Sequence, residues 1–135
     1  MTAIKSETKT VAYSSKVIFD FIRNFENFRD LLPQEKVENY VVDGDSCTFR
    51  IKGMTDLGLK LGETNEATKV EMLSHGKVPF PFKMDIVIQE IDASSSEVHI
   101  DFNGEINSFM VMMIEKPLTN FFNMLVDRLS QLELS

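Results

Sequence analysis

The sequence predicts an α+β domain in which a seven-stranded, curved antiparallel sheet wraps around a long C-terminal helix, with two short helices after strand one. Three observations lead to this fold. The spacing of apolar residues changes from a helical period to a period of two near Val37, and back to a helical period near Ser108. Short turns join the segments of period two, as in an antiparallel meander. With 135 residues, 43% of them hydrophobic, the chain is expected to form a single domain spanning residues 1–135.

The N-terminal part is predicted to hold the first strand and both short helices. Residues 4–13 mix Thr, Val, Ile and Tyr with charged side chains, which is typical of an edge strand. Ser14 and Ser15 offer side-chain oxygens to the free amides at the start of a helix. Apolar residues at positions 18, 21, 22 and 25 give this helix one buried face. A second short helical turn through residues 28–32 ends before Pro33.

Six further strands are predicted between Val37 and Gly104, each with one buried face and one wet face. The first follows Val37, and the others alternate apolar with polar residues around 47–53, 57–61, 70–74, 84–88 and 98–104. Clusters of Gly, Asn, Asp and Ser predict the turns, at 44–45, 53–56, 65–66 and 93–96.

The last element is predicted as an amphipathic helix over residues 108–134. Its apolar residues fall on one arc, which comprises Met110, Met113, Ile114, Pro117, Leu118, Phe121, Met124, Leu125, Leu129 and Leu132. Such a helix is ~40 Å long, about the diameter expected of a domain of this size. It must therefore cross the domain with its apolar arc facing the sheet. Pro117 is expected to kink it or to remove one backbone hydrogen bond.

The sheet is expected to enclose a hollow beside the middle of this helix. A twisted sheet of seven strands is wider than one helix, so its uncovered part has to curl and leave an internal space. The space is predicted to lie beside Met113, Pro117 and Phe121. Inward-facing strand residues form its walls, and these are Phe49, Ile51, Leu59, Met72, Ser74, Met84, Ile86, Ile100 and Phe102. The inward methionines suit a pocket that adapts to varied apolar ligands, and they equally suit ordinary core filling.

Charge and cysteine content disfavour several partners. The net charge is −7, and the 14 basic residues are scattered among 21 acidic ones. Nucleic acid and anionic membrane surfaces are therefore poor partners, because both are bound through basic patches. One cysteine cannot form an internal disulfide, and the N-terminus lacks the apolar segment of a signal peptide. The longest apolar run, 109–114, is far too short for stable membrane insertion. A cytoplasmic location is expected.

Few residues are candidates for chemistry. His75 and His99 are the two histidines, and both fall on the polar phase of their strands, so no metal site is predicted. Cys47 shares the buried phase with Phe49, which favours an inert structural thiol over a nucleophile. No cofactor is expected. The other polar residues on inward phases are Ser74, Thr55, Glu63 and Glu90, the last two at strand ends.

Arg128 lies at the centre of the apolar arc of the last helix, between Leu125 and Leu129. Two interpretations remain open. The side chain extends to the surface and pairs with an acid such as Asp20, or it anchors the carboxylate or phosphate of a ligand.

Residues 14–33, SSKVIFDFIRNFENFRDLLP, carry a family resemblance. A small residue is followed by a Val-Phe pair, then by an apolar-x-x-Phe pattern that ends in Leu-Pro, at Val17, Phe19, Phe21, Phe25, Leu32 and Pro33. This stretch resembles the START-related lipid-transfer, pollen-allergen and polyketide-cyclase superfamily, although Lys16 stands where the family often has an acid. The Gly-x-Val-Pro-Phe stretch at 76–80 is similar to that of small bacterial members. The resemblance covers the whole chain and implies the helix-grip fold.

The superfamily includes lipid carriers, cyclases and oxygenase domains, so fold does not settle activity. The leading hypothesis is a non-catalytic binding or carrier protein for a small hydrophobic molecule, such as a lipid, isoprenoid, quinone or polyketide-like compound. A cyclase or hydrolase acting on such a ligand is one alternative. A protein-interaction module is another, and it would show a filled core with an exposed apolar patch. A monomer or weak dimer is expected.

Overall fold

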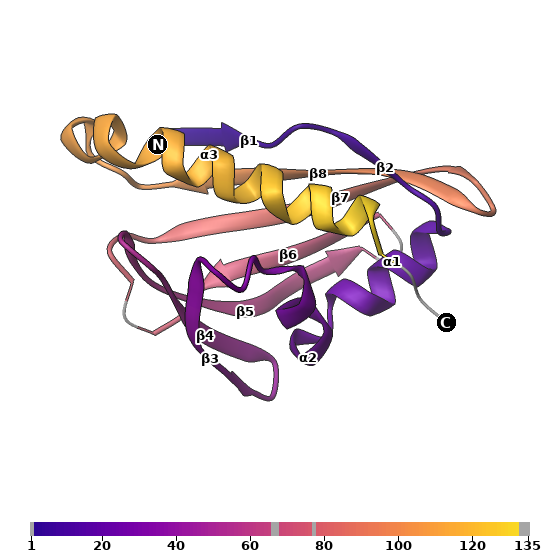
Figure 1. Ribbon diagram of the computed structural model, residues 1–135, viewed down its shortest axis with the longest axis horizontal. Helices are drawn as coiled ribbons and strands as arrows, with labels where there is room; N and C mark the ends of the chain where they lie inside the picture. The colour runs from indigo at the N-terminus through magenta and orange to yellow at the C-terminus, as the bar shows by residue number, and fades with distance from the viewer. Residues whose placement is uncertain (1, 66–67, 77, 133–135) are drawn as a thin grey trace.

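The computed structural model describes residues 2–65, 68–76 and 78–132, which form an antiparallel sheet, short helices and one long helix (Figure 1). In chain order the elements are β1 (Thr2–Lys5), β2 (Lys9–Val11), α1 (Ser15–Ile22), α2 (Phe25–Phe28), the 3-10 turn η1 (Arg29–Leu31), β3 (Val37–Asp43), β4 (Ser46–Ile51), β5 (Thr55–Asn65), β6 (Lys69–Ser74), β7 (Phe82–Asp92), β8 (Ser95–Gly104) and α3 (Ser108–Ser130). The α+β class and the helix-grip arrangement predicted from the sequence are confirmed.

The described residues form a sheet with seven strands on its main path, in the order β1-β8-β7-β6-β5-β4-β3, and β2 adds an eighth strand on β8. Every neighbouring pair is antiparallel. The first strand differs from the prediction over 4–13, because it is divided into β1 and β2. Between them the Ser6 hydroxyl accepts a hydrogen bond from the Ile100 N–H at 2.8 Å. A side chain thus replaces a backbone partner where the strand is interrupted.

The first short helix begins where the sequence predicts, whereas the second begins earlier, at Phe25 and not near Phe28. The Ser14 side chain accepts from the Val17 N–H and caps α1, whose buried residues include Ile18 and Ile22. The helix ends at Ile22, earlier than predicted, because Asn24 caps a separate helix, α2. Leu32 is already extended, next to Pro33. The predicted turn at Gly44 is present with φ of +63°. Glu66, in another predicted turn, and Lys77, in the Gly-x-Val-Pro-Phe stretch, lie outside the described residues.

The long helix α3 packs beside one end of the sheet. It contacts β1, β2, β8 and η1, and Figure 1 shows it running along β1 and β8 while β3 and β4 curl away at the other end of the sheet. The helix ends at Ser130, short of the predicted 134. Gln131 closes the last turn by donating to the Arg128 carbonyl.

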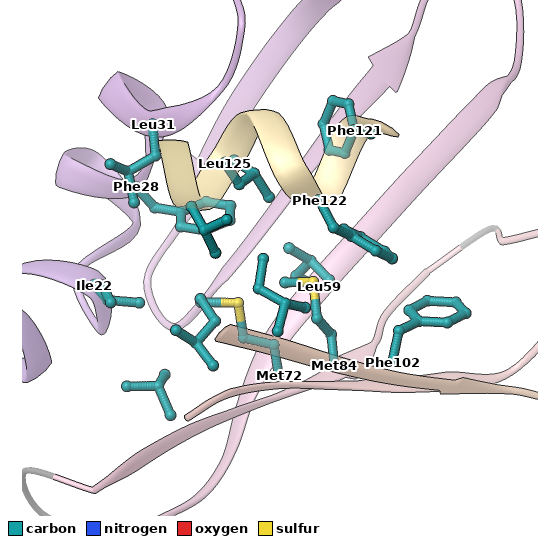
Figure 2. Packing of buried hydrophobic residues seen from close by; sticks show 14 of the residues in the cluster. Ile22, Phe28, Leu31, Leu59, Met72, Met84, Phe102, Phe121, Phe122 and Leu125 are labelled. Carbon is teal, nitrogen blue, oxygen red and sulfur yellow. The ribbon is translucent and has the colours of Figure 1, made fainter. Parts of the chain in front are cut away.

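A filled core lies under the C-terminal half of α3. Phe122 and Leu125 point from the helix toward Leu59, Met72 and Met84 of the sheet (Figure 2). The rings of Phe102 and Phe122 lie 5.2 Å apart, which joins β8 to α3. The buried helix residues are Leu118, Phe121, Phe122, Leu125, Val126 and Leu129. On α3 the fully buried residues thus begin at Leu118, and Met110, Val111 and Ile114 before it pack against the core while half-buried.

Part of the predicted apolar arc is exposed in the first half of α3, contrary to the expectation that the whole arc faces the sheet. Met113, which belongs to the arc, is 62% exposed, and Phe109 and Met112, which lie outside it, are 73% and 87% exposed. Met110, Val111 and Ile114 are half-buried. The physical reason is the position of these residues around the helix. At about 100° per residue, Met113 lies roughly 140° from Leu118, on the side of α3 turned away from the core, whereas Met110, Val111 and Ile114 lie on the side that packs against it.

Candidate functional site

A pocket of about 410 Å³ lies between the middle of α3 and the turn that joins β4 to β5. Pockets for small molecules typically occupy ~300–1,000 Å³, so this volume is in the usual range. The helix contributes Met113, Ile114, Pro117, Asn120, Phe121 and Met124. The sheet contributes Ile51, Lys52, Gly53 and Met54, together with Lys36, the residue before β3.

The sheet side of the pocket is built by a tight turn. Gly53 has φ of +76°, a conformation that glycine adopts without steric cost. Because of this turn, the Met54 N–H donates to the Ile51 carbonyl at 3.0 Å. The Lys52 N–H donates to the Lys36 carbonyl at 2.8 Å, so the two lysines sit on paired backbone.

The helix side of the pocket is the part of the apolar arc that the core leaves uncovered. Phe121 is 4% exposed and contacts the core through Phe122, with 6.2 Å between ring centroids. One turn earlier, Pro117 is exposed at the pocket and α3 continues through it. The arc thus passes from a buried floor at Phe121 to an open rim at Met113. Phe109 and Met112 continue the exposed apolar surface beyond that rim.

The structure brings four of the residues predicted from the sequence to this pocket: Ile51, Met113, Pro117 and Phe121. The other predicted apolar wall residues are buried in the core and do not line it, and these are Phe49, Leu59, Met72, Met84, Ile86, Ile100 and Phe102. The side chains of Phe122 and Leu125 pack against this part of the sheet and take up the space expected to be hollow (Figure 2). A role of these residues in ligand contact stays a prediction.

The two polar residues of the predicted site lie away from the pocket. The Ser74 hydroxyl accepts from the Phe82 N–H at 3.2 Å and borders a different, more open groove of about 540 Å³. Arg128 is exposed and donates through Nε and Nη2 to the Asp30 carbonyl, at 3.2 and 2.9 Å. The expected pairing with Asp20 is wrong, because that carboxylate lies beside Lys16 and Arg23. Arg128 fastens α3 to η1.

Two titratable groups in the core hold their protons tightly. Burial raises the pKa of the Cys47 thiol from 9.0 to about 11. Burial also raises the pKa of Tyr40 above its ordinary value, and its hydroxyl donates to the Phe25 carbonyl at 2.7 Å. A thiol with a raised pKa is a poor nucleophile at neutral pH.

The histidines lie apart from the pocket. His99 Nε2 lies 3.2 Å from Asp101 Oδ2, and His75 is exposed. Among the described residues, no group of three His, Cys, Asp or Glu side chains is placed to hold a metal ion.

Sequence reasoning missed the polar rim of the pocket, which consists of Lys36, Lys52 and Asn120. The signal for the lysines was present, because Lys36 directly precedes one predicted strand and Lys52 sits at the end of the next. Adjacent antiparallel strands place such positions side by side. Asn120 could not be found in this way, since it falls at the edge of the apolar arc.

Within the part of the chain that the structure describes, no helix is long and apolar enough to cross a membrane. No protein-family profile matches the chain, and no curated protein matches it significantly.

Solved structures match the chain over nearly its whole length. A START superfamily protein from Mycobacterium smegmatis matches with a TM-score of 0.74 and 12% identity, over 96% of this chain and 94% of that one. Norcoclaurine synthase from Thalictrum flavum gives a TM-score of 0.75 and 13% identity, over 96% and 92%. The di-domain aromatase/cyclase BexL gives 0.73 and 9%, over 97% of this chain and 46% of that one. The resemblance seen in the sequence is therefore confirmed at the level of structure, and the chain has the helix-grip fold of the START-related superfamily.

Proposed function

We propose that this protein binds a small hydrophobic molecule reversibly in the pocket between α3 and the β4–β5 turn, and carries it without changing it. The observation that carries the proposal is the 410 Å³ pocket bordered by Ile51, Ile114 and Phe121, next to a core of buried apolar residues. Apolar walls with a few polar groups at the rim are typical of sites for small organic ligands.

Two features support a carrier over an enzyme. The polar residues in the described lining of the pocket are Lys36, Lys52 and Asn120, with no carboxylate or histidine among them, whereas acid–base catalysis requires ionisable groups that converge on the reacting atoms. The polar residues considered as catalysts lie elsewhere. Glu90 accepts from the Ser15 N–H and hydroxyl, and the Thr55 hydroxyl donates to a neighbouring carbonyl. Glu63 is exposed, and its N–H donates to Glu71.

The fold neighbours are compatible with ligand binding. Norcoclaurine synthase, which shares this fold, was solved with a transition-state analogue bound. The identity of 13% transfers the fold alone, so the ligand class has to come from this chain's own residues.

The test is a fluorescence titration with the neutral apolar probe N-phenyl-naphthylamine. We expect saturable binding, recovery of the probe unchanged, and loss of binding in Asn120→Trp, which places a large side chain at the pocket. Lys116→Trp is the matched control, because it lies on the exposed part of the same helix outside the lining. Chemical conversion of a bound ligand, or equal binding by both variants, would contradict the proposal.

A protein-interaction module is the second candidate, and the exposed side chains of Phe109, Met112 and Met113 favour it. Neighbouring exposed apolar residues of this size often mark contact surfaces. Light scattering over a range of protein concentrations tests the simplest form, self-association. A mass that doubles for the natural chain and stays monomeric in Met112→Ser would support this candidate.

A further inference from the structure

We infer that the molecule held in the pocket is an amphipathic anion, with an apolar body against α3 and an anionic head group between Lys36 and Lys52. The inference rests on the proposed function and adds the chemical class of the ligand. It is carried by the position of the two ammonium groups and by the charges around them.

The two lysines are held opposite each other. Val37 pairs with Ile51 at the end of the β3–β4 ladder, and the hydrogen bond from the Lys52 N–H to the Lys36 carbonyl continues that pairing by one residue. Like charges directly opposite on neighbouring strands destabilise a sheet. An anion between them would remove this repulsion, so the pair is suited to a negatively charged group.

The surrounding carboxylates do not neutralise the pair. Arg50, on β4, forms ion pairs with the carboxylates of its two cross-strand partners, Glu38 at 3.6 Å and Asp56 at 3.1 Å. Neither lysine has an ion pair among the described residues, and no carboxylate is part of the described lining of the pocket. In a chain with 21 acidic and 14 basic residues, this local excess of positive charge is opposite in sign to the molecule as a whole.

The rest of the rim fits the same ligand. Asn120 faces the pocket from the helix and its amide can donate to a head-group oxygen. Ile114 and Phe121 offer the adjacent apolar surface. A carboxylate or a phosphate on an apolar chain would therefore place charge at the lysines and hydrocarbon along α3.

The experiment compares dodecanoate with dodecanol as competitors for N-phenyl-naphthylamine, below their micelle-forming concentrations. The two competitors share an apolar chain and differ in the charge of the head. Because the rim is partly exposed to solvent, we expect dodecanoate to displace the probe at a concentration about three- to tenfold lower. Added salt should reduce this preference by screening the lysines.

Substitution of the two lysines tests whether the preference for dodecanoate over dodecanol comes from the rim of the pocket. Lys36→Gln with Lys52→Gln should bring the ratio of the two competitors close to one, with each displacement normalised to that variant's own affinity for the probe. Lys5→Gln with Lys60→Gln is the matched control, since both residues are exposed, lie outside the pocket and remove the same charge. The control should keep the preference for dodecanoate.

The outcomes separate this inference from the proposed function. Failure of the natural protein to bind the probe would refute the carrier proposal itself. Probe binding with equal displacement by dodecanoate and dodecanol, or an unchanged preference in the Lys36 and Lys52 variant, would overturn only the head-group inference.

A further arm distinguishes a free acid from a lipid held in a bilayer. If phosphatidylglycerol vesicles sediment the protein in a way that depends on both lysines, the head group belongs to a membrane lipid. Displacement by dodecanoate without sedimentation assigns a free amphipathic acid.

Discussion

Met113→Trp tests whether the rim of the pocket is a binding surface or an incompletely packed part of the core. Met113 lines the pocket and is 62% exposed, so a larger side chain there meets open space. Substitutions at such positions usually change the free energy of unfolding by no more than about 0.5 kcal/mol. At about 4 °C per kcal/mol for a domain of this size, the melting temperature should shift by about 2 °C at most.

The effect of Met113→Trp on ligand binding should be much larger. An indole turned into the pocket competes for the space that a ligand would fill. If it removes two methylene-sized contacts at ~0.8 kcal/mol each, the loss of ~1.6 kcal/mol weakens the Kd by about fifteenfold. Probe titration and thermal melting on the same preparation give both quantities.

Met112→Trp is the control for this comparison. Met112 precedes Met113, is 87% exposed and does not line the pocket. It should keep both the melting temperature and the probe affinity. If Met113→Trp instead lowers the melting temperature by about 4–12 °C, as overpacking by ~1–3 kcal/mol would, while the probe still binds, Met113 is a core residue and the pocket assignment fails. Equal loss of binding in both variants would show that the probe binds the exposed patch.

Three further predictions concern the scaffold. Ser6→Ala leaves the buried Ile100 N–H without its 2.8 Å acceptor and should lower the free energy of unfolding by about 1–3 kcal/mol in a urea titration. Ser46→Ala is the control, because the Ser46 hydroxyl makes its hydrogen bond at the surface, and it should cost less than about 1 kcal/mol. Because the pKa of Cys47 is about 11 in the folded chain against an ordinary 9.0, the unfolded chain loses the thiol proton first as pH rises, and the free energy of unfolding should fall between pH 9 and 11. If the urea midpoint falls equally in Cys47→Val, the loss of stability does not come from this thiol. Asp85 Oδ1 is buried without a hydrogen-bond partner in the described structure, and this residue pairs across the strands with two other carboxylates. Asp85→Asn should therefore raise the melting temperature slightly, and a clear drop would show that its contact with a nearby lysine outweighs the repulsion.

Most of the fold could be predicted because the periodicity of apolar residues is set by burial. The alternation around Phe49, Met72 and Ile100 identifies strands whose inward residues are indeed buried. The division of the first strand could not be predicted, because it depends on a hydrogen bond from Ile100 to the side chain of Ser6, 94 residues away in sequence. Local patterns do not contain contacts of that range.

The candidate site was only partly predictable for a related reason. A helical arc shows which residues are apolar, and it does not show how far along the helix the sheet extends. The wide predicted arc included both Leu118 and Met113, yet one is 2% exposed and the other 62%, because residues five apart lie roughly 140° apart around a helix. The predicted wall residues Leu59 and Met84 lie opposite the covered half of α3, where Phe122 and Leu125 fill the space. The pocket therefore lies beside the predicted stretch of the helix, at Met113, Pro117 and Phe121, but its other wall is the β4–β5 turn and not the predicted strand residues.

The transition at Leu118 also explains why a chain this acidic keeps an apolar surface open. Past that residue the helix arc is buried, whereas in the first turns of α3 only Met110, Val111 and Ile114 pack against the core. Exposed Met and Phe side chains on those turns contribute nothing to that core, and hydrophobic burial favours covering them. Whatever covers these side chains has to come from outside the described residues. A ligand that lies along Ile114 and Phe121, with its charged group at Lys36 and Lys52, would cover the part of the arc that faces the pocket. Phe109 and Met112 would remain uncovered by such a ligand, so probe binding and self-association should respond independently to substitutions on the two sides of the rim.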